Sequence, residues 1–246
     1  MRSCSVCKKL RVARGTLDDY EQLAHYHYLE GRPGPVVATF AWKPVSSLPG
    51  LPHDRPVGVI VYTLPIPEMR LRTLATGDLF SGLDRRTKLA VIDKCFRRIS
   101  RVIIDPRFRG LGLAVRLVRE TMPKLDVPVI EALAVMGRVN PFFEKAGMKP
   151  FTAPPPAAAI EFIEALSMVG VEENEFVDAQ RVQEKLDALS APETRFVESS
   201  ARRFLKGHGD RLNMSPGLER TRYILSRIAF SPVYYIWFNP KPTVAI

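Results

Sequence analysis

The sequence predicts an α/β (α+β) domain that is followed by a helical insertion and a last strand. Three observations carry this prediction. Strand-like and helix-like segments alternate through the first 150 residues, a Pro- and Ala-rich stretch follows at 150–159, and one apolar run stands alone near the C-terminus. Strands that alternate with helices are typical of α/β domains. No stretch approaches the roughly 20 apolar residues that a transmembrane helix needs, so no membrane contact is expected.

The first elements are marked by local signals. Residues 10–16 (LRVARGT) predict a strand, and Thr16 followed by Asp19 forms a variant of the capping box at the start of a helix. Apolar and aromatic side chains then recur at helical spacing, at Leu17, Tyr20, Leu23, Ala24 and His27. A Gly- and Pro-rich cluster at 31–35 ends this helix.

The remaining elements of the domain follow from residue type and periodicity. β-Branched and aromatic residues predict two antiparallel strands at 36–42 and 56–65. Poor patterning predicts a loop at 66–83. The later segments predict a helix at 87–98, a strand at 99–105, a helix at 113–122, a buried strand at 127–136 and a short helix at 140–148.

The C-terminal third is predicted to be mainly helical, with an amphipathic stripe formed by Phe176, Ala179, Val182, Leu186 and Leu189. The apolar run at 231–240 predicts a strand, and a lone strand must pair with others, so we expect it to return to the first sheet. The expected organisation is a flexible N-terminus at 1–9, a core at 10–150, a helical insertion at 151–230, and a terminal strand and tail at 231–246.

The chain is basic, with a formal net charge of +10, which favours contact with nucleic acid or with the phosphates of a cofactor. Solvated charged faces explain the basic clusters equally well. Three cysteines do not make a disulfide framework, and the pair Cys4 and Cys7 is half of a zinc site, so no metal is expected. No apolar region follows the basic start, which predicts a cytoplasmic protein, or one in a host cytoplasm if it is phage-encoded.

A glycine-rich turn, Arg107-x-x-Gly110-x-Gly112, follows a predicted strand and precedes a predicted helix. The first turn of a helix has unpaired amides and lies at the positive end of the helix dipole, so it binds phosphate. Glycines let the backbone approach a ligand closely. The alternative is a tight turn in which the glycines serve packing alone.

Two segments resemble motifs of the GNAT acetyltransferase superfamily. ISRVIIDPRFRGLGLAVRLV (99–118) is similar to its cofactor-binding turn, and VIEALAVMGRVNPFFEKAGM (129–148) is similar to its fifth strand and following helix. The start, LRVARGTLDDYEQL, looks like its first strand and helix, so the resemblance covers roughly residues 10–150.

This resemblance implies a mixed sheet that splays between its fourth and fifth strands, with the pantetheine of acetyl-CoA in the gap. Ile103 and Ile104 would offer backbone groups to the pantetheine, and Asn140 would lie near the thiol. The phosphates would be held at Arg107 and by the amides of Phe108, Arg109, Gly110, Leu111, Gly112 and Leu113.

The catalytic groups of the family are not obvious in this chain. Phe143 stands where many GNAT enzymes have an acidic Tyr, and the fourth strand lacks a carboxylate. Glu131, within an apolar strand, either transfers protons or forms an ion pair with Arg101. His27 and Tyr28 would face the acceptor, although a helix-end histidine is the alternative for His27.

The expected activity is acyl transfer from acetyl-CoA to an amine, with an amino-modified base in DNA or RNA as the favoured acceptor. HYHYLEGRPG and the Ser-Arg strand resemble Mom-type GNAT relatives that modify adenine in phage DNA, and PRFRGLGLAVRLVRET resembles GNAT domains fused to ABC-type ATPases. One alternative is therefore a Mom-like base-modifying enzyme that protects phage DNA from restriction. The other is a non-catalytic module that binds CoA or nucleic acid.

Overall fold

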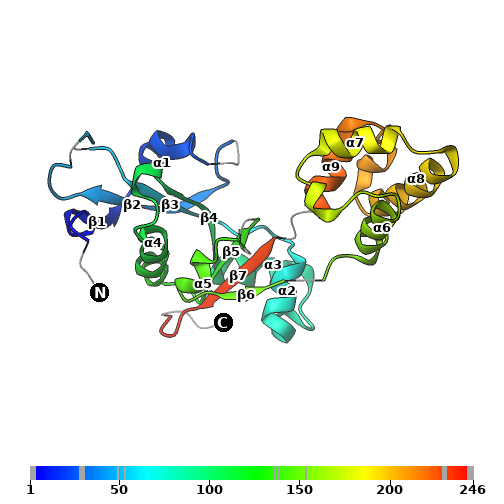
Figure 1. Cartoon of the computed structure of the whole chain (residues 1–246). Helices are drawn as coiled ribbons and strands as arrows, with labels where there is room; N and C mark the ends of the chain where they lie inside the picture. Colours follow the sequence, from blue (N-terminus) through cyan, green and yellow to red (C-terminus); the bar gives the residue numbers. More distant parts are fainter. Residues whose placement is uncertain are drawn as a thin grey trace. The chain divides into compact units, whose positions relative to one another are not determined.

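The computed structural model describes residues 4–27, 31–48, 50–52, 54–135, 137, 139–152, 154–228 and 232–242 (Figure 1). The chain divides into two compact units. The first comprises residues 1–151 and 232–246, and the second comprises residues 152–231.

The first unit is built on a seven-stranded mixed sheet with the strand order β1-β2-β3-β4-β5-β7-β6. The strands are β1 (Leu10–Arg14), β2 (Val36–Pro44), β3 (Gly58–Thr63), β4 (Phe96–Ile104), β5 (Val129–Ala134), β6 (Lys149–Phe151) and β7 (Val233–Phe238). β4 and β5 run parallel, and every other neighbouring pair is antiparallel. β7 lies between β5 and β6, which confirms the predicted return of the last strand to the sheet.

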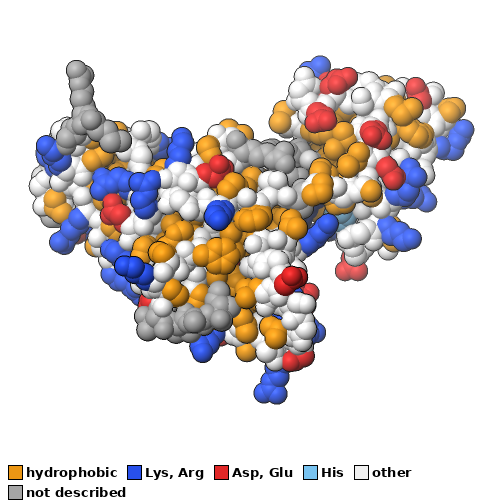
Figure 2. Space-filling model, turned by 90° about the horizontal axis from the view of Figure 1, so that it is seen from below, with side chains coloured by type: hydrophobic (Ala, Val, Ile, Leu, Met, Phe, Trp, Pro, Cys, Tyr) orange, Lys and Arg blue, Asp and Glu red, His pale blue; other side chains and the backbone are white. Residues whose placement is uncertain are grey.

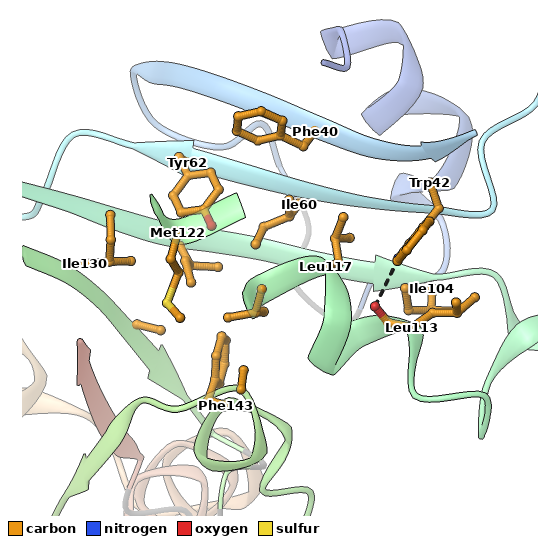
Figure 3. Packing of buried hydrophobic residues seen from close by; sticks show 14 of the residues in the cluster. Phe40, Trp42, Ile60, Tyr62, Ile104, Leu113, Leu117, Met122, Ile130 and Phe143 are labelled. Carbon is orange, nitrogen blue, oxygen red and sulfur yellow. Dashed lines mark hydrogen bonds between the residues drawn. The ribbon is translucent and has the colours of Figure 1, made fainter. Parts of the chain in front are cut away.

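Among its described residues this unit has five α-helices: α1 (Leu17–Ala24), α2 (Arg70–Thr76), α3 (Arg85–Cys95), α4 (Leu113–Thr121) and α5 (Phe142–Lys145). Alternating residues of β3 show which face each helix covers. Val59 and Val61 pack with Leu23 of α1, whereas Ile60 packs with Leu117 of α4 (Figure 3). Because neighbouring strand residues point to opposite faces, α1 and α4 cover opposite faces of the sheet.

The same division continues across the second half of the sheet. Val129 of β5 packs with Ile92 of α3, and the adjacent Ile130 lies in the cluster that contains Phe143 of α5. Trp42 of β2 donates from Nε1 to the carbonyl of Leu113 at 3.0 Å, a buried bond that fixes the start of α4 on the sheet (Figure 3).

The predicted loop at 66–83 is wrong, because this segment contains α2 and a 3-10 helix, η2 (Gly77–Phe80). Arg72 of α2 is buried, and its guanidinium donates to the carboxylate of Glu131. Because a charged residue lies on the inward face of this helix, the sequence lacks the apolar pattern that would have predicted it. Leu71 and Ala75 pack against the core beside it.

The helix predicted at 87–98 extends too far. α3 begins after Asp84, whose carboxylate accepts from the amides of Arg86 and Thr87, and ends at Cys95. Phe96 is already in β4 and pairs with Val129. Apolar spacing alone cannot separate the last turn of a helix from the first residues of a buried strand. The short strand β6 was not predicted.

In the described part of the second unit there are four α-helices: α6 (Ala157–Met168), α7 (Ala179–Asp187), α8 (Ala191–Leu205) and α9 (Leu218–Ile228). The predicted stripe from Phe176 to Leu189 faces one hydrophobic core, which confirms it. Phe204 and Tyr223 belong to the same core. No helix in the described ranges is long and apolar enough to cross a bilayer.

Candidate functional site

The glycine turn between β4 and α4 has an open backbone. Gly110 (φ +81°) and Gly112 (φ +74°, the N-cap of α4) both adopt the left-handed conformation that favours glycine. A Cβ added at either position would meet no heavy atom of a non-adjacent residue within 4 Å. Leu111 between them is exposed. A ligand therefore has access to the main chain of this turn.

The unpaired amides of the turn begin at Gly110, not at Phe108. The amide of Phe108 donates to the carbonyl of Asp105 (2.9 Å), and that of Arg109 donates to the carbonyl of Pro106 (3.3 Å). For the amides of residues 110–113 the described part of the chain supplies no acceptor. They lie at the N-terminus of the nine-residue helix α4, where donors lack intrahelical partners and anions are favoured.

Arg107 shapes the turn and does not extend toward a ligand. Its guanidinium donates to both carboxylate oxygens of Asp105 (Nε to Oδ1 3.1 Å, Nη2 to Oδ2 2.8 Å) and to the carbonyl of Gly50 (3.1 Å). Asp105 is buried, and its Oδ1 also accepts from the amide of Arg107. The guanidinium of Arg107 lowers the pKa of Asp105 against the opposing effect of burial.

Replacing Arg107 with glutamine is expected to lower stability at pH 6 and to have a smaller effect as the pH falls toward 2. A carboxylate with a lowered pKa contributes stability above its unfolded pKa of about 3.9, and this stability is lost as the pH falls through the folded pKa. Urea unfolding of wild type and Arg107→Gln across this range measures the difference. In an Asp105→Asn background the same replacement should show no such pH dependence; an equal effect at all pH values in both backgrounds would contradict the assignment.

A cavity of about 130 Å³, called the slot below, opens where β4 and β5 part. Their parallel pairing runs from Phe96 and Val129 to Ile99 and Ala132 and then stops, although β4 continues to Ile104. Beyond this point Leu133 of β5 pairs with β7 alone. The slot is lined by His27, Arg98, Ile99, Ser100, Arg101, Val102, Leu133, Ala134, Val135, Asn140, Phe142 and Phe143.

An irregularity in β4 places two arginines on the same side of the slot. Arg98 pairs with Thr63 and Arg101 pairs with Val61, so the β4 segment between them holds one residue more than β3 does at Tyr62. Residues three apart in a regular strand point to opposite faces, but one extra residue reverses this. Arg98 and Arg101 therefore share the sheet face that α1 covers.

The register of β4 also decides which peptide groups face the open edge. The amide of Asp105 donates to the carbonyl of Val57 on the β3 side (2.9 Å). By alternation the peptide groups of Ile103 also point to β3. Those of Val102 and Ile104 point to the opposite edge of β4, which β5 no longer pairs with at this position. Arg109 Nε donates to the carbonyl of Ile104 at 3.3 Å. Of the two predicted residues only Ile104 faces the edge, and Val102 was missed because the register is not visible in the sequence.

Glu131 does not line the slot. It is fully buried, and its Oε1 and Oε2 accept from Arg72 Nη2 and Nε, both at 2.7 Å. Tyr234 donates from its hydroxyl to Oε2 at 2.8 Å. The predicted ion pair with Arg101 is therefore wrong, since Arg72 is the partner. Burial, and next the carboxylate of Glu131, raises the pKa of Tyr234, which keeps this hydroxyl a donor.

The slot brings together some of the other predicted residues. His27, which follows α1, lines it together with Asn140 and Arg101, and Phe143 lies on its wall. Tyr28 lies outside the described residues. Arg98 also lines the slot and was not among the predicted site residues. At the N-terminus the amide of Cys7 donates to Cys4 Sγ (3.4 Å), and the described ranges contain no cluster of three or more potential metal ligands.

No protein-family model matches the sequence, and no curated protein matches it significantly. The geometry of one strand is what points to a ligand. β4 carries an open peptide edge beside the slot and leads directly into an exposed turn with unpaired amides. This arrangement suits a long ligand with an anionic end and an uncharged end.

Proposed function

We propose that the protein is an acyltransferase that moves an acetyl group from acetyl-CoA to an amine. The observation that carries the proposal is the parting of β4 and β5 immediately before a turn with unpaired amides. The diphosphate of CoA is the anionic end that the amides of residues 110–113 suit. Its pantetheine arm has amide groups that need partners, and the peptide groups of Val102 and Ile104 at the open edge supply them.

The slot provides what the transfer step requires. The amine nitrogen attacks the thioester carbon, the C–S bond breaks, and CoA leaves as the thiol once it has gained a proton. Holding both reactants in one cavity makes this step effectively unimolecular. A β4 amide at the open edge, such as that of Val102, would stabilise the oxyanion. His27 is the proposed proton acceptor, because it lines the slot and imidazole is the commonest general base.

The amine of a modified nucleobase is the acceptor that the net charge of +10 favours. Figure 2 shows Lys and Arg side chains spread over the visible face and not gathered in one patch. The charge therefore supports a polyanionic substrate in general terms and does not mark a single docking surface.

Two measurements test the proposal. Purified protein incubated with acetyl-CoA and an amine should release CoA thiol together with an acetylated amine of matching amount. Mass spectrometry of nucleosides from expressing cells should show an acetyl increment. A larger, glycine-derived increment would favour Mom-like base modification instead. Absence of thiol release with every amine, together with unchanged nucleosides, would overturn the proposal.

A further inference from the structure

Arg98 and Arg101 place two uncompensated guanidinium groups at the slot. Both line it, and the Nε of each is buried without a hydrogen-bond partner among the described residues, whereas Arg101 Nη1 donates to the carbonyl of Ser100 (2.9 Å). Neither forms an ion pair with any described carboxylate. Leaving a buried charged donor unpaired is costly, and an anion in the slot would remove this cost.

The neighbouring charges do not satisfy these arginines. Glu131 acts electrostatically on Arg98, but both of its oxygens are bound by Arg72 and one also by Tyr234. Arg98 thus lies within electrostatic reach of two other guanidinium groups and of one carboxylate. Burial lowers the pKa of Arg98, Glu131 opposes this, and the charges of Arg72 and Arg101 lower the pKa further. The charges of Arg72, Arg98 and Arg101 outnumber that of Glu131, so an added anion would be stabilised there.

The missing anion does not belong to the proposed cofactor. The pantetheine arm and the thioester are uncharged. The diphosphate belongs at the turn, and the four steps along the chain from Arg101 to Asp105, the residue that follows β4, already span about 13 Å at about 3.3 Å per residue. An anion beside Arg98 and Arg101 must therefore come from the second substrate.

We infer that Arg98 and Arg101 bind an oxyanion of the acyl acceptor, so that the acceptor is an amine that also carries a phosphate or a carboxylate. This inference rests on the proposed function. The planar guanidinium fork matches both kinds of oxyanion, and two arginines on one face can hold one group between them. The slot volume of about 130 Å³ is close to that of a cavity that admits benzene, so it takes the amine end of a small molecule or of a nucleotide.

Nuclear magnetic resonance of the arginine Nε–H groups tests the anion site without any turnover. Inorganic phosphate or acetate is titrated into the full chain at constant ionic strength, and the signals are assigned with Arg98→Lys and Arg101→Lys. The Nε–H signals of Arg98 and Arg101 should shift saturably, while that of the exposed Arg11 should not. Shifts no larger than that of Arg11 for both anions would overturn the inference.

Kinetics then identify the source of the oxyanion. Thiol release is compared for ethanolamine, phosphoethanolamine, β-alanine and an aminated nucleotide. Arg98→Gln and Arg101→Gln should raise KM for the preferred anionic amine about 10- to 100-fold, the loss expected for a charge-assisted hydrogen bond. KM for acetyl-CoA should stay within about twofold, and Arg11→Gln should change neither value. Use of ethanolamine as efficient as that of phosphoethanolamine, β-alanine and the aminated nucleotide would contradict the inference.

The two claims fail separately. If acetyl-CoA does not bind but phosphate or acetate shifts the two arginine signals, the acyl transfer is wrong and the anion site stands. If acetyl-CoA binds and the arginine signals stay unchanged, only the acceptor inference is wrong.

Discussion

Replacing Arg72 with methionine is expected to lower the free energy of unfolding by about 3–5 kcal/mol, the range for removing one partner of a buried ion pair. Arg72 is 1% exposed, and its guanidinium binds both oxygens of Glu131 and the carbonyls of Ile66 and Pro67. Without it the carboxylate of Glu131 stays buried, with Tyr234 as its remaining donor. Urea unfolding followed by circular dichroism measures the loss.

Arg85→Met is the matched control, because Arg85 forms an exposed pair with Glu68 (3.7 Å) and such pairs contribute about 0–1 kcal/mol. The double variant Arg72→Met/Glu131→Met should recover part of the stability, since it removes both buried charges. If Arg72→Met were no more destabilising than Arg85→Met, the Arg72–Glu131 pair would not hold α2 against the sheet.

Replacing Gly110 with tryptophan is expected to weaken acetyl-CoA binding at least about 100-fold, the loss of one or two hydrogen bonds to a charged group. The indole would occupy the space above the unpaired amides of the turn. The left-handed backbone also adds strain of about 1–2 kcal/mol for any L-residue other than glycine. Isothermal titration calorimetry measures the affinity.

The chain provides a closely matched control for this strain. Gly82 lies in the turn before α3, has φ +72°, and would also meet nothing within 4 Å on gaining a Cβ. Gly82→Trp should therefore show a similar loss of stability and wild-type affinity for acetyl-CoA. Equal affinities of Gly110→Trp and wild type would show that the turn does not bind the diphosphate.

Elements with strong local signals could be predicted from the sequence. The capping box at Thr16 and Asp19 forms as expected, with Thr16 Oγ1 accepting from the amide of Asp19 (3.2 Å). β2 and β3 pair as the expected antiparallel strands. The apolar run of β7 predicted a strand that pairs with others, and β7 pairs with β5 and β6. In each case the information lies within a few residues or in a strict hydrophobic pattern.

The features that build the slot depend on contacts between distant segments. The extra residue at Ser100 places Arg98 and Arg101 on the same face of the sheet. It can be recognised only from the register in which β4 pairs with β3. Arg72, the partner of Glu131, is 59 residues away in the sequence. It lies in α2, a helix that was not predicted because its inward face carries this charge. Pairing of the amides of Phe108 and Arg109 is local by contrast, because it comes from the 3-10 turn at Pro106–Phe108, which has no hydrophobic pattern to mark it. Composition and periodicity contain none of this.

The backbone amide spectrum of the wild-type chain during titration with acetyl-CoA tests the central claim most directly. If acetyl-CoA binds along β4 and the turn, the amides of Gly110, Leu111, Gly112 and Leu113 should show saturable shifts, together with that of Val102 at the open edge. The amide of Phe108, already bound to the carbonyl of Asp105, should shift less. A titration that leaves the turn and β4 unchanged, or that shifts signals elsewhere in the chain alone, would contradict the account.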